Sequence, residues 1–230
     1  MAPLSTNRVR AFISYAHADR HRAAEAKGLL DAAGFSSFLA HEDLEVSDEW
    51  RDCLVRELNA CGLFVSLLSK AYMASVWAVQ ESGFIASRLP EVVIAPLSLD
   101  GTRSSGFVGH LQSPSVGPEP IARKQLIEPL TARFPRTILP TAIETAMRAG
   151  NFRSAEASME PLVRFFPLFA PSEAQAFAAG SVKNGQVWSA HLCSTIYLPE
   201  FIAQCGHNVE PPTLRALSHQ IEHGEWYTGD

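Results

Sequence analysis

The segment 63–68, Leu-Phe-Val-Ser-Leu-Leu, is the most strand-like stretch of the chain. It is a nearly continuous apolar run, which is typical of a central strand in a parallel sheet that helices cover on both faces. Around it the first half alternates between strand and helix patterns, the order found in α/β proteins. We therefore expect the first half to form an α/β fold with a buried parallel sheet.

The expected strands and helices of this half follow from apolar spacing, capping residues and glycine stops. Pro96 lies near the end of the last expected strand, which predicts an edge or a strand end there. Asp19, Ser47 and Ser75 are expected to cap the three helices. The strands are expected at 9–14, 35–39, 63–68 and 92–97, and the helices at 19–34, 47–62 and 75–87.

The second half has a different pattern. Residues 100–120 are rich in Gly, Ser and Pro without periodicity, which predicts a long loop. Helices are expected at 121–133, 139–149, 152–166, 172–183, 186–205 and 212–223, with Ser172 as a cap and a kink at Pro199. We expect two domains, an α/β domain at 1–115 and a small all-α domain of unknown role at 116–230.

Composition excludes several classes of function. The 230 residues include 19 Lys and Arg against 24 Asp and Glu, a formal charge of −5 that does not favour nucleic acid as a partner. We find no apolar run of the roughly 20 residues that a membrane span needs. The four cysteines form no CxxC pair and are expected to be reduced thiols. We expect a soluble cytoplasmic protein that binds neither membrane nor nucleic acid.

The chemistry-bearing residues follow the expected strands, where open parallel sheets bind their ligands. Ser14 and Tyr15 follow the first strand and Asp43 follows the second. Trp77 and Glu81 are four residues apart, so they lie on one face of their helix. An aromatic side chain beside a carboxylate can stack a flat heterocycle and stabilise a developing positive charge.

Four sequence boxes in the correct order resemble the TIR (Toll/interleukin-1 receptor) domain family over residues 8–110. The first box is Phe-Ile-Ser-Tyr-Ala-His-Ala-Asp at 12–19, and the second is the strand ending Phe-Leu-Ala-His-Glu-Asp at 38–43. A helix opening at Trp50 and the strand ending in Leu68-Ser69 follow. The segment 75–84, Ser-Val-Trp-Ala-Val-Gln-Glu-Ser-Gly-Phe, resembles the helix that carries the catalytic glutamate in bacterial members. The resemblance implies a flavodoxin-like fold.

The resemblance also implies an activity. Many TIR domains cleave NAD at the nicotinamide–ribose bond, and some cyclise or transfer the ADP-ribose to make a signal molecule. By position Glu81 is the catalytic carboxylate, with Ser14, Tyr15, Asp43 and Trp77 at the substrate. NAD is the substrate, and no cofactor is expected. The implied partners are other TIR domains and a separate effector reached through a nucleotide signal, as in antiphage defence of the Thoeris type. The loop 41–49 lacks the proline-glycine turn of animal receptor members, which favours the bacterial enzyme-like branch.

Other interpretations remain open. The TIR fold can serve as a non-catalytic assembly module, and a nucleoside-processing transferase on a related fold is a third possibility. His219, Glu222 and His223 match the zinc pattern H-x-x-E-H, but the motif lies near the end of the chain without an evident third ligand, so we expect no metal. The sequence does not decide between linear, cyclic and conjugated ADP-ribose as the product.

Overall fold

The computed structural model describes residues 8–40 and 48–228. The chain divides into two compact units, Met1–Pro129 and Leu130–Asp230, which are described separately below. The expected boundary between residues 115 and 116 lies earlier in the chain, and it remains a prediction about which pieces fold independently.

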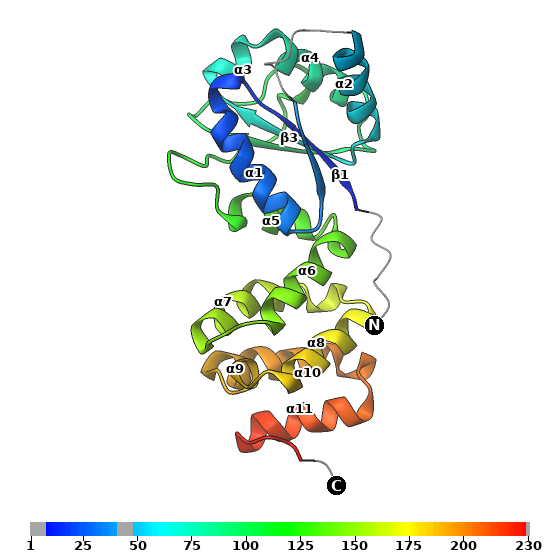
Figure 1. Cartoon of the computed structure of the whole chain (residues 1–230), viewed down its shortest axis with the longest axis vertical. Coiled ribbons are helices and arrows are strands. Elements are labelled where there is room, and N and C mark those ends of the chain that lie inside the picture. The colour runs from blue at the N-terminus through cyan, green and yellow to red at the C-terminus, as the bar shows by residue number, and fades with distance from the viewer. Residues whose placement is uncertain (1–7, 41–47, 229–230) are drawn as a thin grey trace. The chain divides into compact units, whose positions relative to one another are not determined.

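The first unit contains a four-stranded parallel sheet in the order β2-β1-β3-β4 (Figure 1). Its strands are β1 (Arg10–Ser14), β2 (Ser36–Leu39), β3 (Leu63–Leu68) and β4 (Val93–Ser98). All six residues of β3 are buried, as the apolar run predicts. Pro96 lies in β4, an edge strand, where its missing N–H faces no further strand. The expected α/β fold is confirmed.

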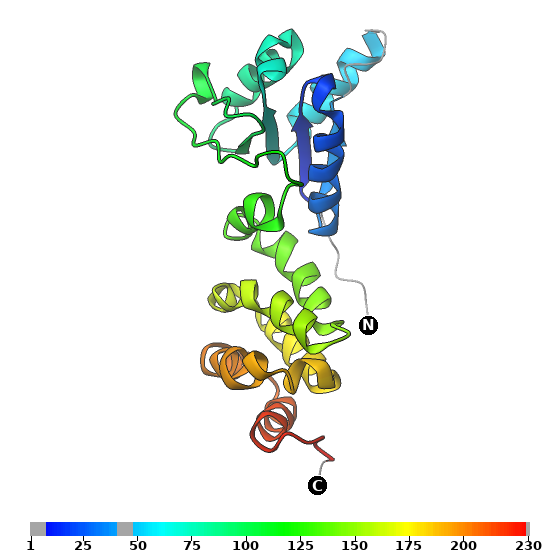
Figure 2. The same cartoon turned by 90° about the vertical axis from the view of Figure 1, so that its left-hand side faces the viewer.

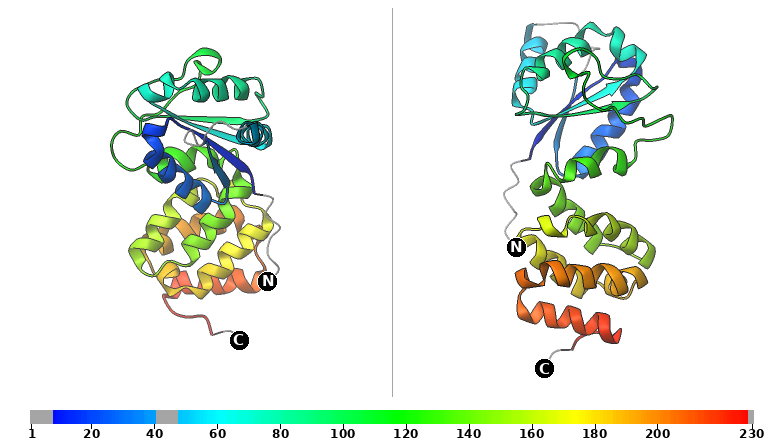
Figure 3. Two further views of the ribbon diagram at one scale, coloured as in Figure 1. Left: turned by 45° about the horizontal axis from the view of Figure 1, so that its top comes forward. Right: turned by 180° about the vertical axis from the view of Figure 1, so that it is seen from behind.

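Helices cover both faces of the sheet (Figure 3). Helix α1 (Arg20–Ala32) packs on β1 and β2, whereas α2 (Asp48–Ala60) and α4 (Val76–Ala86) contact each other and β1. The α2–α4 face has its own core cluster, which includes Phe12, Leu54, Leu58, Phe64 and Ile85. These layers place the carboxyl ends of β1 and β3 beside the first turns of α4.

A short helix, α3 (Lys70–Ala74), precedes α4 and is absent from the sequence expectation. Its cap is Ser69, whose Oγ accepts a hydrogen bond from the backbone N of Tyr72 at 3.0 Å. The expected cap of α4 is confirmed, since Ser75 Oγ accepts from the backbone N of Ala78 at 3.2 Å. Ser47, the expected cap of α2, lies outside the described residues.

Asp19 is a correction to the expected caps. A 3₁₀ turn, η1 (His17–Asp19), leads into α1, and the Asp19 side chain makes no capping hydrogen bond. Its Oδ2 instead accepts from Ser69 Oγ at 2.6 Å. The carboxylate therefore links the start of α1 to the start of α3, both of which follow inner strands.

The expected long loop runs from β4 to α5 (Arg123–Thr131), with one 3₁₀ turn, η2 (Gly106–Val108). Arg22 on α1 holds this loop. Its guanidinium donates to the backbone oxygens of Glu119 at 2.7 Å and Gly117 at 3.2 Å, and to Glu25 at 3.0 Å. Glu25 also accepts from the backbone N of Ile121 at 3.1 Å. A buried arginine thus fixes a segment that has little secondary structure of its own.

The second unit is helical, as expected. Helix α8 (Pro171–Lys183) contacts both α6 (Pro135–Met147) and α11 (Pro211–His223), and lies between them in Figures 1 and 2. The remaining elements are α7 (Phe152–Val163), η3 (Phe166–Leu168), α9 (Gly185–Trp188), the π-helical turn η4 (Cys193–Tyr197), α10 (Leu198–Cys205) and η5 (Gly206–Asn208). Four phenylalanines, Phe166, Phe169, Phe177 and Phe201, pack mostly edge to face at its centre.

Two helix expectations in this unit are wrong. The single helix at 186–205 is interrupted at Ser189–Ala190, and the helical stretch that resumes at His191 contains the π turn η4 directly before α10, whose second residue is Pro199. Ser172 is not the cap of α8, because that helix begins at Pro171 and Glu173 accepts from the backbone N of Ala170 at 2.7 Å. Among the described residues no helix is both long and apolar enough to cross a membrane.

Candidate functional site

The candidate site lies at the carboxyl ends of the two inner strands. Ser14 is the last residue of β1, pairs in register with Ser66 of β3, and is 0% exposed. In open parallel sheets this edge is where ligands bind, because the loops that follow the strands meet there. The Ser14 side chain is therefore buried at the edge of the sheet where α/β proteins bind their ligands.

Helix α4 brings Glu81 to the same place. Ala78, Glu81 and Ile85 are spaced three and four residues apart and are the buried residues of this helix, so the carboxylate points into the protein. Glu81 is only 4% exposed. A buried carboxylate needs a hydrogen-bond donor, since an unpaired buried charge is costly.

Ser14 supplies that donor. Its Oγ donates to Glu81 Oε2 at 2.5 Å, a short hydrogen bond of the kind formed with a charged acceptor. Sixty-seven residues separate the two in the sequence. The structure thus brings together the residue predicted as catalytic and one of the residues predicted to contact substrate.

Tyr72 extends this contact and was not foreseen from the sequence. Its Oη lies 3.0 Å from Ser14 Oγ and 2.8 Å from Ser82 Oγ, and the residue is 1% exposed. The ring packs in a small buried cluster with Ala16, Leu68 and Ala78. Sequence reasoning missed Tyr72 because it lies in α3, a helix of five residues that is too short to show a period.

Trp77 lies one helical turn from Glu81, as predicted, and it has a packing role. Its ring meets Trp50 of α2 edge to face, with 4.9 Å between ring centroids and an interplanar angle of 89°. The indole is half-buried and also borders a hollow of about 470 Å³. The other residues that line this hollow are Ala16, His17, Ala18, Ala71, Ala74 and Ser75.

The hollow beside Trp77 has a polar rim and a lining of small residues. Four of its lining residues are alanines, which leave room for a ligand. His17 Nε2 lies 2.9 Å from Arg20 Nη1, and because the guanidinium can only donate, His17 accepts at this nitrogen. The imidazole and the guanidinium therefore stand together where the turn that follows β1 leads into α1.

The other two predicted site residues have different outcomes. Tyr15, directly after β1, is 5% exposed and packs as a core side chain. Asp43 lies outside the described residues, as does most of the loop 41–49 that follows β2.

Asp100 stands at the same edge, after β4. It accepts from the backbone N of Lys70 at 3.0 Å and of Thr102 at 3.1 Å. Hydrogen bonds from Thr102 first, and then from Lys70, hold the pKa of the Asp100 carboxyl below its ordinary value. Asp100 therefore stays ionised at the start of α3, where a negative charge is favourable.

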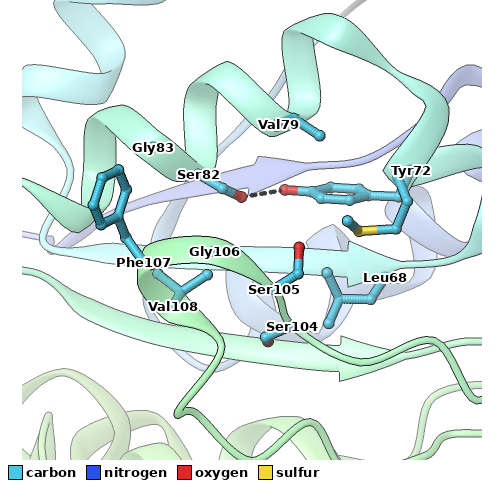
Figure 4. Close-up of a pocket in the computed structure, with 11 residues that line it drawn as sticks. Leu68, Tyr72, Val79, Ser82, Gly83, Ser104, Ser105, Gly106, Phe107 and Val108 are labelled. Atoms are coloured by element: carbon cyan, nitrogen blue, oxygen red, sulfur yellow. Dashed lines mark hydrogen bonds between the residues drawn. The ribbon is translucent and has the colours of Figure 1, made fainter.

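A second cavity of about 270 Å³ opens between α4 and the loop that contains η2 (Figure 4). Tyr72 and Ser82 meet on one side of it through their 2.8 Å hydrogen bond, and Phe107 and Val108 line the other side. Leu68, Met73 and Val79 make most of the remaining wall apolar. Neither Glu81 nor Trp77 is among the described residues that line it.

No metal centre emerges from the described part of the chain, where no three His, Cys, Asp or Glu residues come together. The H-x-x-E-H motif instead forms a ring stack. The His219 and His223 rings lie 4.4 Å apart with an interplanar angle of 22°, and Tyr227 packs against His219. The histidines act here as aromatic packing groups at the end of α11.

A family model described as the TIR domain matches residues 11–126. The chain belongs to the TIR domain family. The match includes the sheet except its first residue, Arg10, as well as the buried Ser14–Glu81 contact and the residues of both cavities. TIR domains occur both as NAD-cleaving enzymes and as scaffolds, and they commonly self-associate.

No curated protein matched the sequence. Among solved structures, the chain resembles the TIR domain of the Toll-related receptor TRR-2 from Hydra magnipapillata, at 14% sequence identity and a TM-score of 0.40, over 54% of this chain and 91% of that chain.

Proposed function

We propose that this TIR domain cleaves NAD at the bond between nicotinamide and ribose, with Glu81 as the catalytic carboxylate. The observation that carries the proposal is the buried hydrogen bond from Ser14 to Glu81 at the carboxyl ends of β1 and β3. Glu81 is a buried carboxylate, 4% exposed, in a family that includes NAD-cleaving enzymes. A solvent-exposed carboxylate on a helix surface would have no comparable use in that reaction.

The chemistry suits a single carboxylate. Glycoside hydrolysis usually needs an acid to protonate the leaving group and a second carboxylate to assist attack. Nicotinamide leaves from a cationic pyridinium and takes the electron pair of the C1′–N bond, so it departs neutral without protonation. Glu81 would hydrogen-bond the ribose hydroxyls and stabilise the positive charge that develops at the ribose. Water then attacks C1′ and releases a proton, or a group of ADP-ribose attacks and closes a ring.

We place the substrate at the hollow beside Trp77, one helical turn from Glu81, although Glu81 is not among the described residues that line this hollow. Trp77 borders the hollow of about 470 Å³ and presents an aromatic surface for a flat ring. Ser14 holds the carboxylate. Tyr15, buried directly after β1, remains a proposed substrate contact on the basis of the family resemblance. Asp43 is retained as a proposed substrate contact on the basis of the family resemblance alone.

Nicotinamide release from NAD, followed by chromatography, tests the proposal. Glu81→Gln preserves the shape of the side chain and removes its charge, and we expect at least about a hundredfold loss of kcat, the scale for removing one group aimed at developing charge. The matched control is Glu57→Gln, which removes a carboxylate paired with Arg10 at 2.9 Å at the opposite end of β1. Equal activity in the Glu81 and Glu57 variants would overturn the assignment.

Assembly is a second candidate function, and exposed apolar side chains favour it. Phe107 is 83% exposed, Val76 69% and Val79 44%, so part of the surface of the TIR domain is apolar. Light scattering after size-exclusion chromatography tests this function, with Phe107→Ser as the variant. Assembly that Phe107→Ser weakens, without nicotinamide release by the wild-type chain, would favour the scaffold over the enzyme.

We also propose the biological setting that the family resemblance implies. The enzyme would act in the cytoplasm of a bacterium during phage infection, and its nucleotide product would activate a separate effector. The helical unit would sense the trigger or support assembly. Protection of cells from phage by the wild-type chain and not by Glu81→Gln tests this role. Equal protection by both chains would contradict it.

A further inference from the structure

Three hydroxyl groups connect Glu81 to the cavity beside η2. Ser14 Oγ donates to the carboxylate at 2.5 Å, Tyr72 Oη lies 3.0 Å from Ser14 Oγ, and Ser82 Oγ lies 2.8 Å from Tyr72 Oη. Ser14 and Tyr72 are fully buried, whereas Ser82 is half-buried and lines the cavity (Figure 4). The row therefore begins at a buried charge and ends at an opening in the surface.

Hydrogen counting fixes the direction of the row. A serine hydroxyl has one hydrogen, and Ser14 commits it to the ionised carboxylate, which can only accept. In that arrangement the hydrogen between Ser14 and Tyr72 comes from Tyr72, and Tyr72 accepts from Ser82; both oxygen–oxygen contacts allow these roles. The backbone oxygen of Ala78, 3.2 Å from Tyr72 Oη, competes for the same phenol hydrogen at a longer distance. With Glu81 ionised, all three hydroxyls point toward the carboxylate.

When all the hydrogen bonds of a row point in the same direction, each bond becomes stronger. Hydrogen bonds in a chain polarise one another, and a buried site of low dielectric enlarges the effect. The donors favour the charged form of Glu81, the form that stabilises positive charge at the ribose. The row also selects one orientation of the Ser14 hydroxyl and thereby one position of the carboxylate oxygen that it contacts.

The fold builds the row from three separate elements. Ser14 ends β1, Tyr72 lies in α3 and Ser82 follows Glu81 in α4. The position of Tyr72 is set from both sides, since Ser69 caps its backbone N and its ring is enclosed by the cluster around Leu68. Tyr72 is therefore fixed both at its backbone and at its ring.

We propose that Tyr72 and Ser82 are positioning residues that act on Glu81 through Ser14. They stabilise the charged form of the carboxylate through Ser14 and hold it in place for the reaction, and they extend its hydrogen-bond network to the cavity lined by Phe107 and Val79. This inference rests on the proposed NAD cleavage for its catalytic consequence. The hydroxyls are arranged in this way, and stabilise the charged form of Glu81, whether or not the chain cleaves NAD.

Tyr72→Phe is the first test, because it removes one hydroxyl and keeps the ring. We expect kcat for nicotinamide release to fall about threefold to tenfold with KM within about twofold, and the acid limb of the kcat profile to move about half a pH unit upward. The upward direction follows because a less well stabilised carboxylate takes up its proton at higher pH. Tyr197→Phe in the helical unit is the matched control and should change neither quantity.

Ser82→Ala is the second test and covers the case in which Tyr72→Phe does not fold. Ser82 is half-buried at an open cavity, so its removal leaves the packing intact. We expect the same changes as in Tyr72→Phe but smaller, because Ser82 is one bond further from the carboxylate. Unchanged kcat and acid limb in both folded variants would overturn the proposal.

A carbon-13 NMR titration of the Glu81 carboxyl, assigned with Glu81→Gln, separates this inference from the proposed function. If the wild-type chain releases no nicotinamide but Tyr72→Phe still raises the pH of Glu81 protonation, the hydroxyl row stands and the proposed reaction fails. If nicotinamide is released and the titration is the same in wild type and Tyr72→Phe, the row has no effect on Glu81 and the inference fails. The described elements that contact α4 carry other titratable or charged groups, and Tyr15 and His17 lie beside them. Tyr72→Phe leaves all of these groups in place, so a shift of the Glu81 titration reports the lost hydroxyl. The groups on those elements are Arg10, Arg51, Asp52, Cys53, Arg56, Glu57 and Lys70.

Discussion

Replacing Ser14 by alanine removes the hydroxyl donor of the buried Glu81 carboxylate. Ser14 is 0% exposed, so solvent cannot replace the hydrogen bond without opening the site. A hydrogen bond to a charged group contributes about 1.5–3 kcal/mol to stability. Tyr72 loses its contact with Ser14 but keeps Ser82 and the backbone oxygen of Ala78 within reach, so its share of the loss is small. We therefore expect Ser14→Ala to lower the free energy of unfolding of the sheet unit by about 1.5–3 kcal/mol.

Amide hydrogen exchange of β1 and β3 measures this loss in the sheet unit separately from the helical unit. The matched control is Ser66→Ala, which removes a buried hydroxyl at the position paired with Ser14 across the sheet. Removal of this neutral hydroxyl, which faces no charged partner among the described residues, should cost about 1 kcal/mol or less. If the same 1.5–3 kcal/mol is lost from the transition state, kcat falls roughly tenfold to 150-fold. Equal destabilisation by both substitutions would show that the Glu81 carboxylate does not depend on Ser14.

Three further predictions follow from the packing. Arg22→Met removes three hydrogen bonds that hold the loop before α5 and should lower the free energy of unfolding of the sheet unit by about 2–4 kcal/mol, measured in urea. Ser75→Ala removes the cap of α4 and should cost about 1 kcal/mol in the same assay. Burial, assisted by the charge of Glu156, raises the pKa of the Cys193 thiol to about 12, so the native thiol should resist disulfide reagents at pH 8 while the half-buried Cys53 reacts.

A specific result would contradict each of these three predictions. Loss of less than about 0.5 kcal/mol in Arg22→Met would show that the loop is held by other contacts. Unchanged stability in Ser75→Ala would mean that water replaces the cap. Since the folded-state pKa of Cys193 lies above its ordinary value of 9.0, its contribution to stability is complete below about pH 9 and is lost as the pH rises toward 12. Rapid labelling of native Cys193 at pH 8 would contradict its burial.

The sheet could be read from the sequence because its signals are local. The apolar run of β3 and the serine cap of α4 each depend on neighbouring residues alone, and both were predicted correctly. Pro96 marked an edge strand for the same reason. Glu81 and Trp77 were placed on one helix face by spacing, although only the fold shows that Ser14 lies 2.5 Å from the carboxylate.

Two of the misses arise from contacts between distant segments, and a third arises from local backbone geometry within one expected helix. Asp19 is drawn from its helix cap to Ser69, fifty residues later, and no local pattern shows this competition. Tyr72 joins Ser14 across fifty-eight residues from a helix too short to show a period. The break before Pro199 comes from a turn at Ser189 and a π turn, whose sequences retain a helical pattern.

Nicotinamide release from NAD by the wild-type chain, Glu81→Gln and Glu57→Gln, measured side by side, decides whether Glu81 is the catalytic carboxylate. We expect the wild type and Glu57→Gln to release nicotinamide at similar rates, and Glu81→Gln to lose at least about a hundredfold. Release by folded Glu81→Gln at the wild-type rate would contradict the claim that Glu81 is the catalytic carboxylate of this TIR domain.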